Sequence, residues 1–420
     1  MNNTQAINKK IDYNEKINYK KFYPTAIALY FTYFIHGIGA SIMGQYKQDL
    51  AAQWGAGVLA DGTLDVSMVL AVIAALGLGR LISLPFSGTI SDKCGRKTSG
   101  IIGIVCYVAY LVGIAFSPNM TVGYIFAIVG GIANSFLDTC VSPSCMEIFP
   151  ENGSIANMFT KFSISVAQFL LPFMIGFVAT SALPFKTIFL VAAVAIGIDG
   201  LLILFLPFPQ TNAGNVNADK NKSVKKEKMK FTPVSIALIS IGFTCSSTFM
   251  IWLNCNQELG RLYGVTDPSK IQSLYAAGTV CAILMSTVLI KKGIKPVKIL
   301  ILYPSISAVM LLAIYFVKSP VIVLVGGFVL GYSAAGGVLQ LCVSTANEMF
   351  PKDKGKITSI VMIASSIANY TILNLASYLT KVGGSEQGPL NVVLLNVGVT
   401  VIGVLLALYV NKEYEKQQIA

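Results

Sequence analysis

Charged side chains are scarce in this chain, and the residue clusters that build many enzyme and metal sites are missing. Aspartate, glutamate, lysine and arginine make up 12% of the 420 residues, against about 25% in soluble domains. The chain has one histidine and eight cysteines, with no CxxC pair and no Cys/His cluster, which argues against a zinc site or a disulfide framework. No nucleophile and base pair is visible either, so we expect neither an enzyme nor a bound cofactor or metal.

Apolar runs fill most of the sequence instead. The mean hydropathy is +0.69, and runs of about 20 apolar residues, long enough to cross a bilayer as a helix, recur with short polar breaks. The first 22 residues are polar and lysine-rich, without the apolar core of a cleavable signal peptide. We predict twelve spans, which begin near Thr25, Val66, Ser99, Thr121, Ser154, Phe185, Val234, Ile271, Val297, Val321, Ile357 and Leu390.

The basic residues are distributed unevenly between the predicted loops. If both termini are cytoplasmic, 23 lysines and arginines fall in the tails and the cytoplasmic loops, and six fall on the opposite side. This is the positive-inside asymmetry that orients membrane proteins. The net charge of +12 is therefore explained by topology and not by nucleic-acid binding. We expect a multi-pass, monomeric protein of the cell (plasma) membrane.

A polar, lysine-rich linker divides the chain into two halves that resemble each other. "CVSPSCMEIFP" at 140–150 and "CVSTANEMFP" at 342–351 occupy equivalent places at the ends of the fourth and tenth spans. A parallel repeat of this kind is one architecture of transporters, which bind substrate between the halves. We predict an all-α membrane protein with two pseudo-symmetric six-helix bundles. The expected segments are a tail at 1–23, bundles at 24–207 and 233–410, a linker at 208–232 and a second tail at 411–420.

The loop after the second span, "GTISDKCGRK" at 88–97, has the pattern G-x-x-x-D-[RK]-x-G-[RK]-[RK]. Glycine permits close helix approach and tight turns, and the basic residues hold the loop on the cytoplasmic face. This loop resembles the signature of the major facilitator superfamily, whose aspartate helps to close the cytoplasmic side. The resemblance implies a gate, to which we add two glutamates that precede Phe-Pro at the ends of the fourth and tenth spans. The expected gating residues are Gly88, Asp92, Gly95, Arg96, Lys97, Glu147 and Glu348.

The fourth and fifth spans carry a narrower resemblance. "GIANSFLDTCVSP", "FPENGS" and "NMFTKFSIS" are similar to the corresponding segments of the fucose:proton symporter family. The triplet Leu137, Asp138 and Thr139 matches that family's Leu-acid-Thr triplet, which implies that Asp138 carries the proton. The acid expected in the first span of that family has no counterpart here, and Thr160 stands in place of a fifth-span amide.

An acid inside a membrane span normally faces a wet cavity or a partner, because exposure to lipid is unfavourable. Asn134, Asp138, Ser142 and Cys145 share one helical stripe. For Asp138 we consider proton coupling, a static ion pair with Arg80 or Lys161, and direct substrate contact. His36, the only histidine, lies in the first span as either a packing residue or a second proton-coupling group.

Amides and aromatic rings recur on the helices expected to line the central cavity. Amides both donate and accept hydrogen bonds, and aromatic faces pack on pyranose rings, so the set favours a polyhydroxylated ligand. Some of these amides are expected only to join helices. The candidate substrate-binding residues are Tyr33, Arg80, Asn134, Gln168, Trp252, Asn254, Gln257, Gln340, Asn347, Tyr370 and Asn374.

The sequence thus predicts a secondary active transporter that moves a small polar solute across the bilayer by alternating access. The favoured cargo is a sugar taken up with protons. Two alternatives remain open, which are a proton-driven multidrug exporter and an organic-anion or carboxylate carrier that uses Arg80 and Lys161 as its ligand clamp. A non-transporting sensor with the same fold is a third.

Overall fold

The computed structural model describes residues 19–60, 62–209, 231–350 and 354–419. Within these ranges the chain is helical apart from turns and an isolated bridge between Val58 and Leu64. Most spanning helices have 20 to 30 residues, which corresponds to roughly 30 to 45 Å at 1.5 Å per residue and is enough to cross a bilayer. The chain therefore folds as its composition predicts, into an all-α membrane protein.

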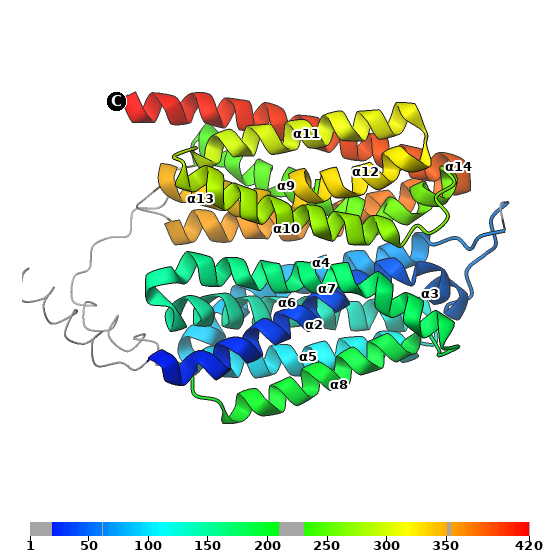
Figure 1. Cartoon of the computed structure of the whole chain (residues 1–420), viewed down its shortest axis with the longest axis horizontal. Helices are drawn as coiled ribbons and strands as arrows, with labels where there is room; N and C mark the ends of the chain where they lie inside the picture. The colour runs from blue at the N-terminus through cyan, green and yellow to red at the C-terminus, as the bar shows by residue number, and fades with distance from the viewer. Residues whose placement is uncertain (1–18, 61, 210–230, 351–353, 420) are drawn as a thin grey trace, which may run out of the picture.

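The helices of the two halves pack on opposite sides of the molecule (Figure 1). The first half comprises η1 (Tyr19–Phe22), α2 (Tyr23–Gln45), α3 (Lys47–Gln53), α4 (Ser67–Cys94), α5 (Arg96–Phe116), α6 (Met120–Ile148), η2 (Pro150–Asn152), α7 (Gly153–Thr180) and α8 (Lys186–Phe205). The second half comprises α9 (Pro233–Leu262), α10 (Lys270–Lys291), α11 (Pro296–Val317), α12 (Pro320–Leu330), η4 (Gly331–Ala335), α13 (Val338–Met349) and α14 (Lys354–Ile419).

Helix α14 contains the last two predicted spans. It has 66 residues, far more than one crossing needs, and Gly384 interrupts it with φ 61° and ψ −156°. Only glycine adopts this backbone conformation readily, so the chain reverses there. Among the described residues, eleven helices are long and apolar enough to span a membrane, and the division of α14 at Gly384 accounts for the twelfth predicted span.

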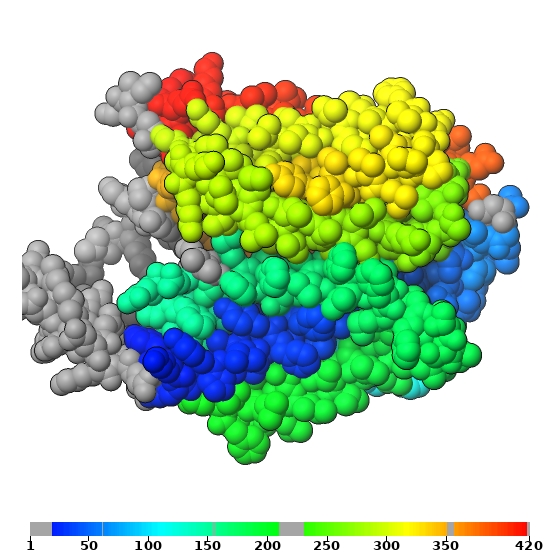
Figure 2. Space-filling model, in the orientation of Figure 1, coloured from blue at the N-terminus to red at the C-terminus, as the bar shows by residue number. Residues whose placement is uncertain are grey.

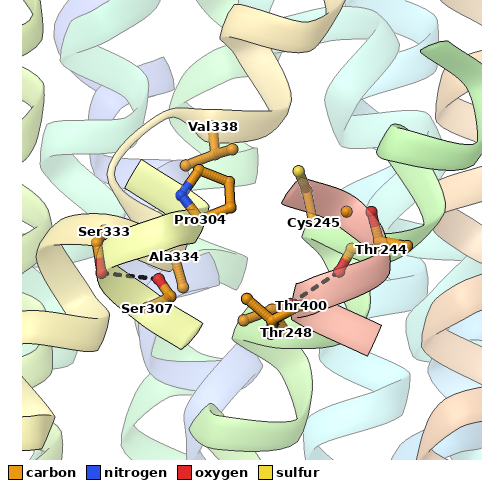
Figure 3. A pocket seen from close by; sticks show the side chains of 10 residues that line it. Thr244, Cys245, Thr248, Pro304, Ser307, Ser333, Ala334, Val338 and Thr400 are labelled. Atoms are coloured by element: carbon orange, nitrogen blue, oxygen red, sulfur yellow. Dashed lines mark hydrogen bonds between the residues drawn. The ribbon is translucent and has the colours of Figure 1, made fainter. Parts of the chain in front are cut away.

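The tenth predicted span differs from the uninterrupted helix that its hydropathy suggests. After α12 the backbone forms a π-helical turn, Gly331–Ala335, and Gly337 takes φ 90° before α13 begins. The segment "GYSAAGG" is apolar, and this is why hydropathy alone predicts a plain span. Figure 3 shows a small cavity beside the interruption, where Ser307 hydrogen-bonds Ser333 at 2.7 Å and Thr248 hydrogen-bonds Thr400 at 2.9 Å.

The two halves meet along a seam that runs the length of the molecule (Figure 2). Across it α2 contacts α9, α4 contacts α14, and α7 contacts α10. The second half has two buried apolar clusters of its own, whereas the main cluster of the first half continues across the seam into α9 and α14, where it includes Ile251, Cys255, Ile372, Leu373, Ala376 and Val392. The helices are arranged as two six-helix bundles, as predicted. We call the end with Lys97, Lys292 and Lys412 the lysine-rich end, and the opposite end, with α3, the α3 end.

Candidate functional site

Asp138 lies at the centre of a charged cluster in the first bundle. The Tyr33 hydroxyl donates a hydrogen bond to Asp138 Oδ1 at 2.6 Å, and Arg80 Nη2 donates to Asp138 Oδ2 at 2.7 Å. Asp138 precedes the end of α6 by ten residues, roughly 15 Å along the helix. At this depth its side chain is still 32% exposed, and that of Arg80 is 17% exposed. The ion pair is therefore reachable by solvent well inside the bundle.

Small residues bring α4 and α6 close enough for this pair to form. A Cβ atom at Gly79 would overlap the Ile128 carbonyl, and one at Gly131 would overlap the Leu76 carbonyl. Such small residues allow membrane helices to pack backbone against backbone. The Ser135 hydroxyl adds a hydrogen bond to the Arg80 carbonyl at 3.1 Å. Arg80 is thus held on the helix next to that of Asp138, at the same depth in the bundle.

Lys161 and His36 complete the cluster. The Lys161 side chain on α7 is exposed and interacts electrostatically with Asp138 and Arg80, but it forms no ion pair with any described residue. His36 lies between the rings of Tyr33 and Tyr107, with both ring centroids 5.5 Å away. Its Nδ1 is buried without a partner among the described residues. We call Tyr33, His36, Arg80, Asp138 and Lys161 the central site.

The predicted gating motif lies at the lysine-rich end. Arg96 pairs with Asp92 at 2.8 Å and with Glu147 at 3.4 Å, so it joins α4, α5 and α6. Gly95 takes φ 93° at the sharp turn between α4 and α5, a conformation that favours glycine. Lys97 Nζ donates to two carbonyls at the end of α8.

Two further predicted gating residues take different environments. No neighbouring atom would meet a Cβ at Gly88, so close helix packing does not account for that glycine here. Glu348, in the second bundle, accepts a hydrogen bond from the Tyr414 hydroxyl at 2.9 Å, whereas Glu147 contacts a basic residue of the loop. A gating role for either residue remains a prediction.

A second polar cluster joins the bundles at the α3 end. Lys47 Nζ contacts Glu258 Oε2 at 2.5 Å and also donates to the Asn254 carbonyl. Gln257 Nε2 donates to Gln45 Oε1 at 2.8 Å. The Lys47 side chain is fully buried and that of Glu258 is 14% exposed. We call Gln45, Lys47, Asn254, Gln257 and Glu258 the α3 latch.

The latch includes two residues that the sequence assigned to substrate. Asn254 and Gln257 take part in bundle-to-bundle contacts, and Asn254 Nδ2 also donates to the carbonyl of Met250 on its own helix. The side-chain oxygens of both amides are buried without a partner among the described residues. Gln257 joins the two bundles through its side chain, as the sequence reasoning expected for some of the amides, whereas Asn254 does so through its backbone carbonyl.

The remaining candidate substrate residues have varied surroundings. The Tyr370 hydroxyl lies 3.5 Å from that of Tyr124, across the seam. Trp252 lies in an apolar cluster of the second bundle and lines a small cavity together with Val393. Gln340 is exposed on α13.

Three of the amides among these candidates bond to a neighbouring helix or to their own. Gln168 donates to Ser41 at 2.9 Å, Asn374 donates to the Tyr370 carbonyl, and Asn347 accepts from Thr358. Asn134 Oδ1 is buried one turn before Asp138 on α6, without a partner among the described residues. Of the predicted substrate-binding set, Tyr33 and Arg80 thus belong to the central site, and Asn134 lies on the same helical stripe as Asp138.

Sequence reasoning missed three charged positions, which are Lys47, Glu258 and Asp199. Lys47 was assigned only a topological role and Glu258 none; the signal in the sequence is a lysine directly after one span and an acid near the end of another. Asp199 was overlooked within the apolar sequence of the sixth span. It is 3% exposed, and its contact is a 2.5 Å hydrogen bond from the Thr32 hydroxyl.

Two bundles of membrane-spanning helices around a charged central site are the architecture of a secondary transporter. The chain belongs to the Major Facilitator Superfamily, whose sequence profile matches residues 29–266 and 234–420. It is 31% identical to the inner membrane transport protein YdiM of Escherichia coli K12 over 94% of this chain and 96% of that protein. It is also 31% identical to the uncharacterized MFS-type transporter YfkL of Bacillus subtilis 168, over 93% and 97% respectively.

The fold is also that of solved transporters. The crystal structure of the D-xylose-proton symporter superposes with a TM-score of 0.70 at 17% identity, covering 93% of this chain and 97% of that one. At this identity the likeness shows the fold alone. Together with the family membership it makes the chain a membrane transporter and not an enzyme.

Proposed function

We propose that this protein is a secondary active transporter that moves a small polar solute by alternating access, driven by protons that bind Asp138. The observation that carries the proposal is the solvent-reachable ion pair between Asp138 and Arg80, deep in the first bundle. A charged group at this depth is energetically unfavourable, and such groups normally mark a transport pathway or a proton relay. Protonation of Asp138 would neutralise one member of the pair and leave the guanidinium without its counter-ion.

Loss of that counter-ion links proton binding to the conformation of the bundles. Removing the charge of one partner from a fully buried ion pair costs about 3–5 kcal/mol, and the partial exposure of Asp138 and Arg80 lowers that cost here. A solute that supplies new contacts to the freed groups offsets this cost. The empty protonated site is therefore unfavourable, and the loaded protonated site is favourable, which is the condition for coupled transport.

The conformation described here supports a cycle with two alternating seals. Polar contacts between the bundles gather at the α3 end, where the latch joins α2 and α3 to α9, and the Ser377 hydroxyl donates to the Ser67 carbonyl. At the lysine-rich end the described contact across the seam is a weak one, 3.5 Å from Thr287 to Met158 Sδ. If the positive-inside orientation holds, this is a conformation sealed towards the exterior.

Two resemblances support the sugar that the sequence favours as cargo. The Leu137-Asp138-Thr139 triplet resembles that of the fucose:proton symporters, and the solved D-xylose-proton symporter has the same fold.

Reconstituted protein tests the proposal in two assays. A thermal-shift screen of sugars, organic acids and drugs selects the compound that most stabilises the purified transporter. Proteoliposomes then compare its accumulation under an inward proton gradient with its exchange at equal pH. We expect Asp138→Asn to abolish accumulation and to leave exchange, because the neutral amide mimics a permanently protonated carboxyl. Accumulation that survives in Asp138→Asn would refute the proposed coupling.

A further inference from the structure

The central site carries more positive than negative charge. Arg80 and Lys161 are the lysines and arginines of this sequence that lie within the interior of spans, and Asp138 is the acid beside them. With all three ionised, the local net charge is +1. In the described part of the second bundle, α9 to α14, the acids are Glu258, Asp267, Glu348, Glu386, Glu413 and Glu415. These lie at or near the ends of spans or in loops, so the described part of that bundle provides no mid-span carboxylate to balance the excess.

The two cations differ in what holds them. Arg80 uses one nitrogen of its guanidinium on Asp138, while its Nε is buried without a partner among the described residues. Lys161 is exposed and has no ion-pair partner within the described part of the chain. A guanidinium is a planar fork that binds a carboxylate through two nitrogens. The site therefore has unused donors for one further negative charge, on two helices that face Asp138.

We propose that the substrate of this site is a small organic monoanion, a carboxylate, that is carried together with one proton. This inference rests on the proposed function and adds the substrate class to it. Lys161 holds the carboxylate of the incoming substrate while Asp138 is ionised. When a proton binds Asp138, the contact with Arg80 weakens and the guanidinium turns to the substrate carboxylate. Proton binding thus replaces the Asp138 carboxylate by the substrate carboxylate as the partner of Arg80.

Charge conservation favours this substrate class over a neutral solute. The empty site holds two cations and one anion, with a net charge of +1. With one proton on Asp138 and one carboxylate bound, the net charge is again +1. A neutral solute with one proton would raise it to +2, and added charge is unfavourable once the site closes to solvent in the middle of the membrane during the crossing. A monoanion allows the loaded and empty sites to reorient with the same charge.

The groups that face Asp138 are consistent with this exchange. Helix α2 presents Tyr33 and His36, α4 presents Arg80, and α7 presents Lys161. Helix α5, which also packs on α6, directs Arg96 to Glu147 at the lysine-rich end. The Tyr33 hydroxyl can donate to the ionised carboxyl or accept from the protonated one. Asp138 therefore keeps a hydrogen-bond partner in both states.

Matched pairs of acids and neutral compounds test the substrate class by thermal shift of the full-length protein. Suitable pairs are D-glucuronate with D-glucose, D-gluconate with sorbitol, and benzoate with benzyl alcohol. We expect at least one acid to stabilise the protein while its neutral partner does not. Lys161→Gln should raise the half-saturating concentration of that acid at least about tenfold, the equivalent of one lost charge contact. Lys270→Gln, an exposed lysine at the start of α10, is the matched control and should leave it unchanged.

Three results of this screen would overturn the inference. They are stabilisation by neutral compounds as strong as by their acid partners, no stabilisation by any of the acids, and equal affinity in Lys161→Gln and wild type. If a neutral compound stabilises the protein and accumulates under a proton gradient through Asp138, the proposed function stands and the carboxylate class fails. If no stabilising compound accumulates under a proton gradient, the proposed function itself fails.

A voltage experiment tests charge conservation independently. Proteoliposomes take up the stabilising acid under a fixed inward proton gradient, with and without a 100 mV potassium diffusion potential imposed by valinomycin. Electroneutral cotransport should change less than about twofold, whereas movement of one net charge changes the accumulation ratio roughly 40- to 50-fold per 100 mV. A voltage response of that larger size would refute the one-proton, one-anion exchange.

Discussion

Glu258→Gln in the α3 latch should shift this transporter towards the conformation that is open at the α3 end. Glu258 neutralises Lys47, a fully buried ammonium that reaches from the first bundle to the second. In the variant the lysine stays buried in the latched conformation without a counter-ion. In the opened conformation the Lys47 side chain can be hydrated. The loss of its counter-ion therefore destabilises the latched conformation and not the opened one.

The size of the shift follows from the contacts of Lys47. Removing one member of a buried pair destabilises by about 3–5 kcal/mol. The lower end applies here, because the Asn254 carbonyl still accepts from Lys47 and an amide oxygen replaces the carboxylate. About 3 kcal/mol corresponds to a roughly 100-fold change in the ratio of the two conformations. A protein that is almost entirely latched would become a mixture with both conformations populated.

Double electron-electron resonance measures this ratio directly. Spin labels at Ala52→Cys in α3 and Thr266→Cys after α9, in a variant without the eight native cysteines, report the separation of the bundles at the α3 end. Arg261→Gln is the control, since Arg261 is 36% exposed and lies 3.7 Å from Glu258. Exposed pairs contribute about 0–1 kcal/mol, so its distance distribution should stay close to wild type. An unchanged distribution in Glu258→Gln, or an equal shift in both variants, would contradict the latch.

Four further substitutions have defined expectations. Arg80→Lys keeps the charge but loses the fork, so transport should fall at least about tenfold while the yield and melting temperature stay unchanged; loss of folding instead would assign Arg80 a structural role. Gly131→Ala places a Cβ against the α4 backbone and should lower the free energy of unfolding by about 1–3 kcal/mol. Its melting temperature should be lower than that of Gly398→Ala, where no neighbouring atom meets the added Cβ. Asp92→Asn should slow turnover with a stability change below about 1 kcal/mol, since Asp92 is 66% exposed; equal turnover would remove the gate. Asp199→Asn should retain proton-driven accumulation, because the contact of its carboxyl is a neutral hydroxyl, and lost accumulation would identify a second proton site.

Hydropathy and charge predicted the architecture well. Twelve crossings, two bundles and the basic loop at 88–97 follow from residue order, because each bilayer crossing needs its own apolar run. An ion pair of Asp138 with Arg80 or Lys161 was one of the three roles considered from the sequence, since a mid-span charge normally has a partner or faces a wet cavity. Which of Arg80 and Lys161 forms that ion pair depends on how closely α4 approaches α6 at Gly79 and Gly131. That distance is a property of tertiary packing and is not encoded in spacing along one helix.

Contacts between distant segments account for most of what sequence reasoning missed. Lys47 and Glu258 are separated by 211 residues and lie in different bundles, so no local pattern relates them. Asn254 and Gln257 have the composition of a binding surface, yet the Gln257 amide bonds to Gln45 of the other bundle and the Asn254 amide donates to its own helix. The π-helical turn at Gly331–Ala335 was missed because hydropathy reports the polarity of side chains and carries no information on backbone hydrogen bonding.

Calorimetric titration of the stabilising compound in two buffers of different ionisation enthalpy tests most directly whether Asp138 ties proton binding to substrate binding. The difference between the two apparent enthalpies gives the number of protons taken up for each molecule bound. Because linkage between two ligands is reciprocal, wild type at a pH where Asp138 is ionised should take up about one proton with each substrate, and Asp138→Asn should take up none. No proton uptake in wild type, or the same uptake in both proteins, would contradict the account.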